Sequence, residues 1–210
     1  MKGSVSSYVL GVDWDKFYPA ELQEGIQIRK VSAEEGLAFL NKYFDEIYHR
    51  NQSQDELSFK EFSPPENKAR YYEVFGDFFL IRDLKLNKDI GYQLGNVADW
   101  GSYNFRSVGI LDSHKGLGIY PSAFELLWKA LASAGVQKIE GHVCPSNHQH
   151  LHILNKLGAI IQGTVATENF GFMYHLVVYL NKESRDFFVD RYSQTKSSDR
   201  SSNKKFKMVS

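Results

Sequence analysis

The sequence holds little cysteine, no long apolar run and no excess of charge of either sign. Cys144 is the single cysteine among 210 residues, which excludes an intramolecular disulfide framework and is typical of a protein from a reducing compartment. No apolar run approaches the roughly 18 residues that a membrane-spanning helix needs. Residues 1–7 lack the apolar core of a secretory signal. We therefore expect a cytoplasmic protein without a membrane span.

Charge is balanced over the whole chain and unbalanced near its end. The 25 Lys and Arg residues match 25 Asp and Glu residues, so neither nucleic acid nor an anionic membrane is an expected partner. Residues 193–210 contain five basic residues, one acid and many serines. Because such a composition cannot bury a core, we predict one domain over residues 1–192 and a flexible basic tail over residues 193–210. A solvated tail is favoured over an anchor for an acidic surface.

Hydrophobic periodicity predicts strands and helices around one sheet. Ser32 and Glu35 form a capping-box pattern before a helix over 33–50, and two shorter helices are predicted over 121–134 and 147–157. Strands are predicted over 26–29, 71–81, 90–94, 103–111, 136–143, 160–167 and 172–180. Consecutive strands followed by alternating strands and helices indicate a mixed α/β (α+β) sandwich.

The segment from Val108 to Pro121 joins a strand, a glycine loop and a helix in that order. The apolar strand breaks at Asp112, Gly116 and Gly118 follow, and Pro121 opens a helical pattern. The first-turn amides of a helix have no partner within the helix, and the helix dipole favours negative charge there. The segment therefore predicts an anion site made from backbone amides, suited to a phosphorylated cofactor.

This order of elements resembles the GNAT superfamily of acyl-CoA-dependent N-acyltransferases. Residues 113–118, Ser-His-Lys-Gly-Leu-Gly, are similar to the family's Arg/Gln-x-x-Gly-x-Gly/Ala loop after a strand. Residues 143–147, together with the Leu-Gly-Ala at 157–159, are similar to the family's second motif. The resemblance covers residues 71–180, and it implies a central mixed, mostly antiparallel sheet of about six to seven strands with helices on both faces.

The resemblance also implies acetyl-CoA, or another acyl-CoA, as co-substrate, and no metal. In the family the loop amides hold the CoA pyrophosphate, the strand before them lies beside the thioester, and an Asn of the second motif lies near the pantetheine arm. Carried over residue by residue, these roles fall on Val108, Gly109, Ile110, Ser113, His114, Lys115, Gly116, Leu117, Gly118, Ile119, Tyr120 and Asn147.

The implied reaction is transfer of an acetyl or other acyl group to a small primary amine, which attacks the thioester directly. A finer resemblance lies in residues 12–18, Val-Asp-Trp-Asp-Lys-Phe-Tyr, which look like the W-D-x-x-F-F opening of enzymes that acylate nucleotide-linked amino sugars. Residues 105–110 and 174–176 are similar to the same group. The aromatic residues of the opening serve equally well to pack the N-terminus. The candidates for contacts with a sugar are Asp13, Asp15 and Tyr18.

Three residues depart from the family pattern. Ser113 stands where Arg or Gln is usual, and His150 stands where a small residue is common. Leu154 stands where many members place a Tyr that protonates the leaving thiolate. Since Leu154 cannot supply a proton, either another residue does so or the domain binds CoA without catalysis. A longer acyl donor and a peptide amine as acceptor are the further alternatives.

His142 and Tyr174 are the candidate catalytic residues. His142 ends the strand beside the cofactor strand and titrates in the range that a general base needs, although a structural His would give the same pattern. Tyr174 is the candidate replacement for the missing acid, although a core Tyr is an equal alternative. Because strand side chains alternate, only one of Tyr174 and His175 can face the site.

The run of histidines around Cys144 does not predict a metal site, because alternate histidines on a helix do not converge on one face. Cys144 also lacks an acid-rich relay that would activate it as a nucleophile. Paired late strands often form dimer contacts in the GNAT superfamily, so a homodimer is expected.

Overall fold

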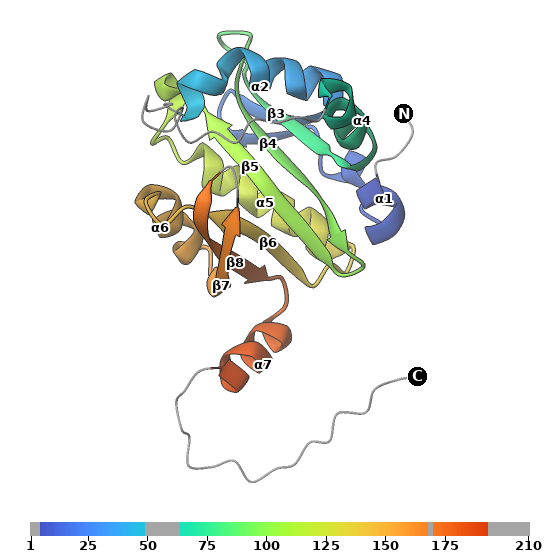
Figure 1. The fold of residues 1–210 in the computed structure, drawn as a ribbon. Coiled ribbons are helices and arrows are strands. Elements are labelled where there is room, and N and C mark those ends of the chain that lie inside the picture. Colours follow the sequence, from blue (N-terminus) through green and yellow to red (C-terminus); the bar gives the residue numbers. More distant parts are fainter. Residues whose placement is uncertain (1–4, 49–63, 168–169, 193–210) are drawn as a thin grey trace.

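Eight strands form a single sheet in the computed structural model, which describes residues 5–48, 64–167 and 170–192 (Figure 1). Their order across the sheet is β1-β2-β3-β4-β5-β6-β8-β7. Only β5 and β6 run parallel among these neighbours, so the mixed, mostly antiparallel sheet is confirmed. The strands are β1 (Ala20–Gln23), β2 (Ile26–Val31), β3 (Asp77–Asp83), β4 (Lys88–Asp99), β5 (Ser102–Ile110), β6 (Lys138–Val143), β7 (Ile160–Thr167) and β8 (Gly171–Tyr179).

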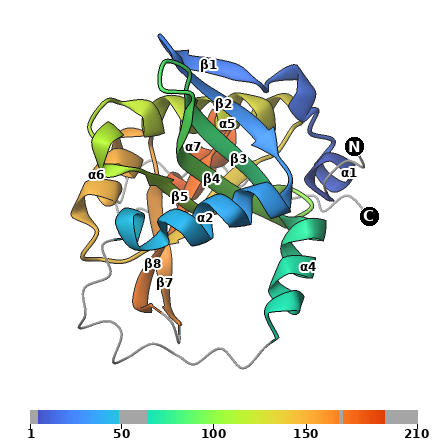
Figure 2. The same ribbon diagram turned by 90° about the horizontal axis from the view of Figure 1, so that it is seen from above.

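Helices cover both faces of the sheet, as Figure 2 shows for α2 and α4 on one side and α5 on the other. The alternating side chains of β3 explain why: Phe78 and Leu80 pack with α2, whereas Phe79 and Ile81 belong to the core beneath α5. The helices are α1 (Val5–Leu10), α2 (Ala33–Tyr48), α4 (Pro65–Phe75), α5 (Ile119–Ser133), α6 (His148–Lys156) and α7 (Lys182–Tyr192), with 3-10 turns η1 (Trp14–Lys16) and η2 (Asp112–His114).

The helix boundaries follow the predicted signals. The Glu35 amide donates to the Ser32 hydroxyl at 3.2 Å at the start of α2, as the capping pattern predicts. Gly135 and Gly158 take positive φ values of 80° and 84° just after α5 and α6, a conformation that glycine adopts without strain. Positions 49–50 of the first predicted helix lie outside the described residues, as does the predicted basic tail over 193–210.

The predicted strand over 71–81 is wrong in its first half. Residues Pro65–Phe75 form α4, and only Asp77–Asp83 form a strand, separated from the helix by Gly76 in an extended conformation. The aromatic residues that suggested a strand are spaced for a helix: the rings of Tyr71 and Phe75 lie 5.1 Å apart, one turn from each other. The proline at the first helical position fixes the start of α4.

The strand β1 adds one strand to the predicted sheet. Its sequence, Ala-Glu-Leu-Gln, is short and mostly polar, so it carries little of the alternation that marks a strand. It pairs with β2 from Ala20 opposite Ile28 to Gln23 opposite Ile26. Just before it, Trp14 and Tyr18 are buried against Phe79, with ring centroids 5.2 Å and 4.5 Å away. The aromatic residues of the N-terminal opening therefore pack the N-terminus onto the core.

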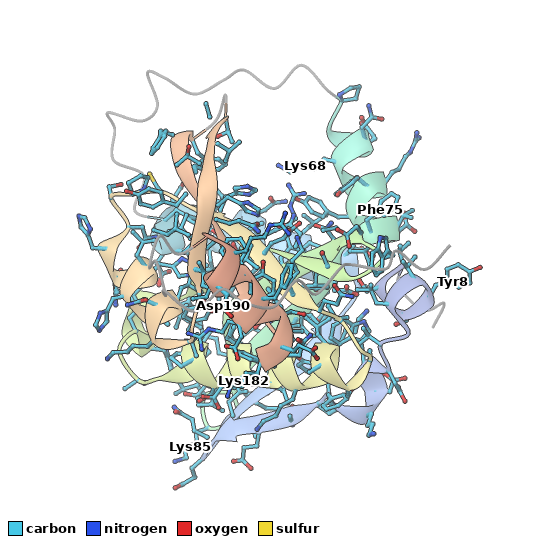
Figure 3. The ribbon with its side chains drawn as sticks, turned by 90° about the horizontal axis from the view of Figure 1, so that it is seen from below. Tyr8, Lys68, Phe75, Lys85, Lys182 and Asp190 are labelled. Atoms are coloured by element: carbon cyan, nitrogen blue, oxygen red, sulfur yellow. The ribbon has the colours of Figure 1, made fainter. Side chains whose placement is uncertain are left out.

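The chain after β6 forms a hairpin and a last helix. β7 and β8 pair antiparallel from Ile160 opposite Val177 to Thr167 opposite Gly171, and the predicted turn residues 168–169 lie outside the described residues. In Figure 3 this hairpin and α4 project to the same side of the molecule, and Lys68 of α4 lies between them. Within the described ranges, no helix is long and apolar enough to cross a membrane.

Candidate active site

The sheet opens between β5 and β6. These strands pair only from Ser102 opposite Lys138 to Asn104 opposite Glu140, although β5 continues to Ile110. Beyond the last pair lies a cavity that is open to solvent. The residues that line it are Phe105, Arg106, Ser107, Phe124, Ile139, Glu140, Gly141, His142, Val143, His150, Leu154, Ala159, Leu176 and Val178.

A β-bulge in β5 gives this cavity walls from both faces of the sheet. Leu94 pairs with Ser107 and Gly95 pairs with Phe105, so Arg106 is an extra residue without a partner on β4. Phe105 packs on Phe124 of α5 at 5.4 Å between ring centroids, whereas the Ser107 hydroxyl bonds to the hydroxyls of Tyr48 and Tyr92 on the α2 side. In a regular strand, two residues that lie two positions apart face the same side, so the bulge is what places Phe105 and Ser107 on opposite faces.

The glycine loop after β5 leads directly into α5, as the sequence predicts. Gly116 and Gly118 have φ values of 80° and 76°, and no described atom lies within 4 Å of the place that a Cβ would take on either. No described side chain caps the first turn of α5, which begins at Ile119. The loop is therefore an open backbone cradle before a helix N-terminus, which suits a pyrophosphate group.

The side chains of the loop are held by neighbouring acids. His114 Nε2 lies 3.1 Å from Asp83 Oδ2, and Lys115 Nζ lies 2.6 Å from Asp112 Oδ1. A backbone hydrogen bond from Leu86, followed by the bond to His114, lowers the pKa of Asp83. Backbone amides thus remain the main anion donors of the loop, because both basic side chains already have a carboxylate partner.

The strand residues predicted beside the thioester alternate between the two faces. Val108 and Ile110 pack into the core beneath α5. Gly109 faces α2, where a Cβ would come within 2.4 Å of Ile47 and 2.8 Å of Tyr92. These three residues share one feature: they lie beyond the last pair of β5 with β6, so none of their backbone groups on that edge pairs with β6.

The wall from α5 and α6 combines apolar side chains with one polar pair. Leu154 is 6% exposed and lines the cavity, in agreement with its place in the sequence motif. One turn earlier, His150 Nε2 lies 2.9 Å from the Tyr120 hydroxyl. Burial lowers the pKa of His150 to about 4 and raises the pKa of Tyr120, so both are neutral at pH 7. Asn147 caps α6, because its Oδ1 accepts from the His150 amide at 3.1 Å.

The wall from β6 presents His142 to solvent on the opposite face. His142 pairs with His175 of β8, and their rings stack with centroids 5.0 Å apart. His175 Nε2 lies 3.6 Å from Glu140 Oε2, which accepts from Lys138 Nζ at 2.9 Å. Burial and then the charge of His175 lower the pKa of His142, with a further contribution from Arg106, while Glu140 opposes the shift.

Tyr174 lies on the other face of β8 from His175. It is paired with Val143 and packs partly into the core beneath α5 and α6, and it does not line the cavity. The structure therefore brings His175 and Glu140 to His142. Sequence reasoning missed Glu140; the signal that could have found it is its position two residues before His142, on the same face of the strand.

The N-terminal candidates for sugar contacts, Asp13, Asp15 and Tyr18, do not line the cavity. Tyr18 is buried in the core, and the two acids are exposed beside η1. Over the part of the chain that the structure describes, no group of three or more His, Cys, Asp or Glu side chains could hold a metal ion.

Solved structures that are similar to this fold include N-acetyltransferases. A spermidine N-acetyltransferase from Vibrio cholerae, in complex with CoA and spermine, matches with a TM-score of 0.55 at 13% identity, over 75% of this chain and 97% of that chain. A dodecameric structure of spermidine N-acetyltransferase from the same species has a TM-score of 0.57 at 14% identity, over 77% and 97%. The ribosomal-protein-S5-alanine acetyltransferase from Vibrio fischeri has a TM-score of 0.57 at 14% identity, over 78% and 97%.

No protein-family model and no curated protein matches the sequence. The likeness in structure nevertheless extends over nearly the whole of each solved chain, and the sheet that opens between two parallel strands agrees with the fold that the two motifs imply. This chain therefore has the GNAT fold.

Proposed function

We propose that the protein is an acyl-CoA-dependent N-acyltransferase that moves an acetyl group to a small primary amine. The observation that carries this proposal is the cavity where β5 and β6 part, because its walls come from both faces of the sheet. A thioester on the α5–α6 side and an amine on the α2–α4 side would meet there, which supplies the proximity that acyl transfer needs.

The residues present fit a CoA co-substrate. The loop over 113–118 and the first turn of α5, with Ile119 and Tyr120, offer backbone amides to a pyrophosphate. The edge of β5 over 108–110 offers backbone groups to the pantetheine arm and to the thioester oxygen. Asn147 is the residue that the resemblance assigns to the pantetheine arm, and its Oδ1 also caps α6.

In the reaction, the amine nitrogen bonds to the thioester carbonyl carbon, the C–S bond breaks, and the CoA thiolate leaves. His142 takes the proton of the amine, directly or through water, because it is exposed at the cavity and its lowered pKa keeps it neutral at pH 7. His175 orients the His142 ring by stacking on it, and Glu140 stabilises the imidazolium that forms.

The proton for the thiolate has two candidate sources on the α6 face. Tyr174 is the one that the sequence suggests, and its side chain lies on this face without lining the cavity. The Tyr120–His150 pair lies closer, since His150 lines the cavity one turn before the Leu154 that replaces the family's Tyr. We favour the pair: the neutral His150 ring would donate a hydrogen bond to the sulfur as negative charge develops on it, and the thiolate would take its proton from solvent after it leaves.

For the acceptor we propose an amino sugar linked to a nucleotide, on the resemblance of residues 12–18 to that group of enzymes. The structural neighbours are named for spermidine, spermine and a ribosomal-protein alanine, so a polyamine or a peptide amine is the alternative. Longer acyl donors are a further alternative, because the cavity is lined mainly by apolar side chains.

Titration calorimetry with acetyl-CoA, followed by a thiol-release assay with a panel of amines, tests the proposal. We expect His142→Asn to lower kcat by about 100-fold or more, as for loss of a general base. The matched control is His148→Asn, because His148 is exposed and does not line the cavity. This variant should keep wild-type rates. Acetyl-CoA binding without thiol release from any amine would instead support a non-catalytic CoA-binding module, which Leu154 favours.

We also propose a homodimer through the β7–β8 hairpin. β7 is an edge strand, and Ile161, Phe170 and Phe172 of this region are each more than half exposed. Light scattering on wild type and on Phe172→Glu tests it: a wild-type dimer that becomes a monomer in the variant is the expected result, and a wild-type monomer contradicts it.

A further inference from the structure

One arginine stands at the mouth of the cavity, at the bulge in β5. Arg106 is exposed and lines the cavity, and its guanidinium carbon lies 5.8 Å from the ring centroid of Tyr71 and 5.7 Å from that of Tyr72. Both tyrosines belong to α4. A guanidinium that stacks on aromatic rings keeps its N–H edges available for hydrogen bonds, so the two rings position a charged donor group at the opening.

No carboxylate among the described residues neutralises the charge of this arginine. Among the described residues, no carboxylate lies within salt-bridge distance of Arg106, whose contacts are with the two aromatic rings. Of the described residues that line the cavity, Glu140 alone is acidic, and it is already bonded to Lys138 and close to His175. Because arginine does not lose its proton in proteins, the mouth of the cavity carries a permanent positive charge.

A hydroxyl group follows this charge in the strand. Ser107 comes directly after Arg106 and also lines the cavity, and its hydroxyl shares hydrogen bonds with the hydroxyls of Tyr48 and Tyr92. Tyr48 is exposed, while Tyr92 is fully buried. The Ser107 hydroxyl is therefore a second polar group of the cavity wall, of a kind that can bond to an oxygen atom of an anion.

We infer that Arg106 binds an anionic group, a carboxylate or a phosphate, on the amine acceptor. The inference rests on the proposed acyl transfer and narrows its acceptor to amines that carry a negative charge. A planar guanidinium binds either group through two parallel hydrogen bonds, which fixes orientation as well as affinity. A polyamine would instead bring positive charge to a mouth that is already positive and that offers one acid with partners of its own.

Matched acceptor pairs test this inference. One arm compares an amino acid with its amide, a second arm compares an amino sugar with its phosphate ester, and spermidine serves as a polycation. Each is measured with acetyl-CoA on wild type, Arg106→Gln and Arg185→Gln, an exposed arginine of α7 outside the cavity. Each variant is compared with the wild type on the same acceptor, which cancels the intrinsic reactivity of that amine.

For the anionic member of at least one pair, we expect Arg106→Gln to lower kcat/KM by about 10- to 100-fold, as for loss of a charged hydrogen bond. The neutral member and spermidine should change less than about threefold, and Arg185→Gln should change neither. The arm that responds identifies the anion as a carboxylate or a phosphate. Equal losses for both members of each pair, or no loss for either, would overturn the inference.

Binding measurements separate this inference from the proposed function. Where no acceptor turns over, the same ratios are measured as dissociation constants, by calorimetry on protein saturated with CoA. Failure to bind acetyl-CoA contradicts the proposed function. Binding of CoA with acceptor affinities that do not depend on the anion or on Arg106, or with no anionic acceptor bound, contradicts the inference alone. Equal midpoints of thermal unfolding for the two glutamine variants show that Arg106→Gln remains folded.

Discussion

Gly141 is the residue on which the opening of the sheet depends most directly. It lies on β6 one residue after the last pair with β5, and it lines the cavity. A Cβ added there would lie 2.8 Å from the carbonyl oxygen of Phe105. Because the obstacle is backbone, it cannot move aside as the end of a flexible side chain would. Gly141→Ala therefore pushes β5 and β6 further apart just beyond their last pair.

The size of the effect follows from that distance. Ordinary contact begins at 3.4 Å, so the two backbones must separate by 3.4 − 2.8 = 0.6 Å. Overpacking of this kind costs about 1–3 kcal/mol, and the lower entropy of unfolded alanine returns about 0.4–1 kcal/mol of it. We expect a net loss of about 1–2 kcal/mol in the free energy of unfolding, together with weaker acetyl-CoA binding because the cavity wall has moved.

Urea unfolding followed by circular dichroism measures the first effect, and calorimetry with acetyl-CoA measures the second. Gly163→Ala is the matched control: it lies on a strand of the same sheet, and no described atom lies within 4 Å of its Cβ position. The control should gain about 0.4–1 kcal/mol and bind acetyl-CoA as the wild type does. Equal stability of the two variants would show that β5 and β6 are not in close contact at Gly141, and would refute the described geometry.

Three further predictions concern the same site. Because burial and then His175 lower the pKa of His142, the rise of kcat/KM with pH should have its midpoint below 6.5 and disappear in His142→Asn; a wild-type midpoint above 6.5 contradicts this. The folded-state pKa of His150, about 4, lies below the ordinary 6.5, so the unfolded state takes up this proton first as pH falls. The unfolding free energy of the wild type should then fall by up to about 3 kcal/mol from pH 6.5 to 4, and that of His150→Gln should lack this fall. An equal fall in both proteins would contradict the lowered pKa of His150. Gly118→Ala should cost about 1–2 kcal/mol and weaken acetyl-CoA binding, whereas Gly118→Asn should bind more tightly than the alanine variant; calorimetry that ranks them otherwise shows that the φ of 76° is not needed.

The later half of the fold could be predicted from sequence because local signals there agree with the tertiary structure. Gly135 and Gly158 end their helices with positive φ, and Asn147 caps the helix that it precedes. The helix over residues 65–75 could not be predicted, because its aromatic residues have high strand propensity and yet lie at helical spacing. Tyr72 packs on Phe78 with 5.6 Å between ring centroids. A tertiary contact of this kind favours the helix where local propensity alone does not distinguish helix from strand.

The proposed cofactor loop and the proposed catalytic groups differ in how far sequence can predict their geometry. The conformation of residues 113–118 follows from their glycines, so the shape of this loop could be predicted directly, while cofactor binding there stays a prediction. The pairing of His142 with His175 depends on the register of β6 against β8, and the pairing of Tyr120 with His150 depends on how α5 and α6 pack. The spacing of these residues along the chain predicts neither the strand register nor the helix packing.

One inserted residue links the proposed acyl transfer to the proposed choice of acceptor. The bulge at Arg106 turns Ser107 toward α2 while Phe105 faces α5, so that the strand edge beyond Asn104 is free of β6 and borders a cavity open to both faces. The same insertion places the guanidinium of Arg106 at the α4 side of that cavity. Deleting Arg106 would pair β5 with β4 without an extra residue and would remove the bulge together with the charge, whereas Arg106→Gln removes the charge alone. A loss of acetyl-CoA binding in the deletion but not in the substitution would therefore separate the role of the backbone from that of the side chain.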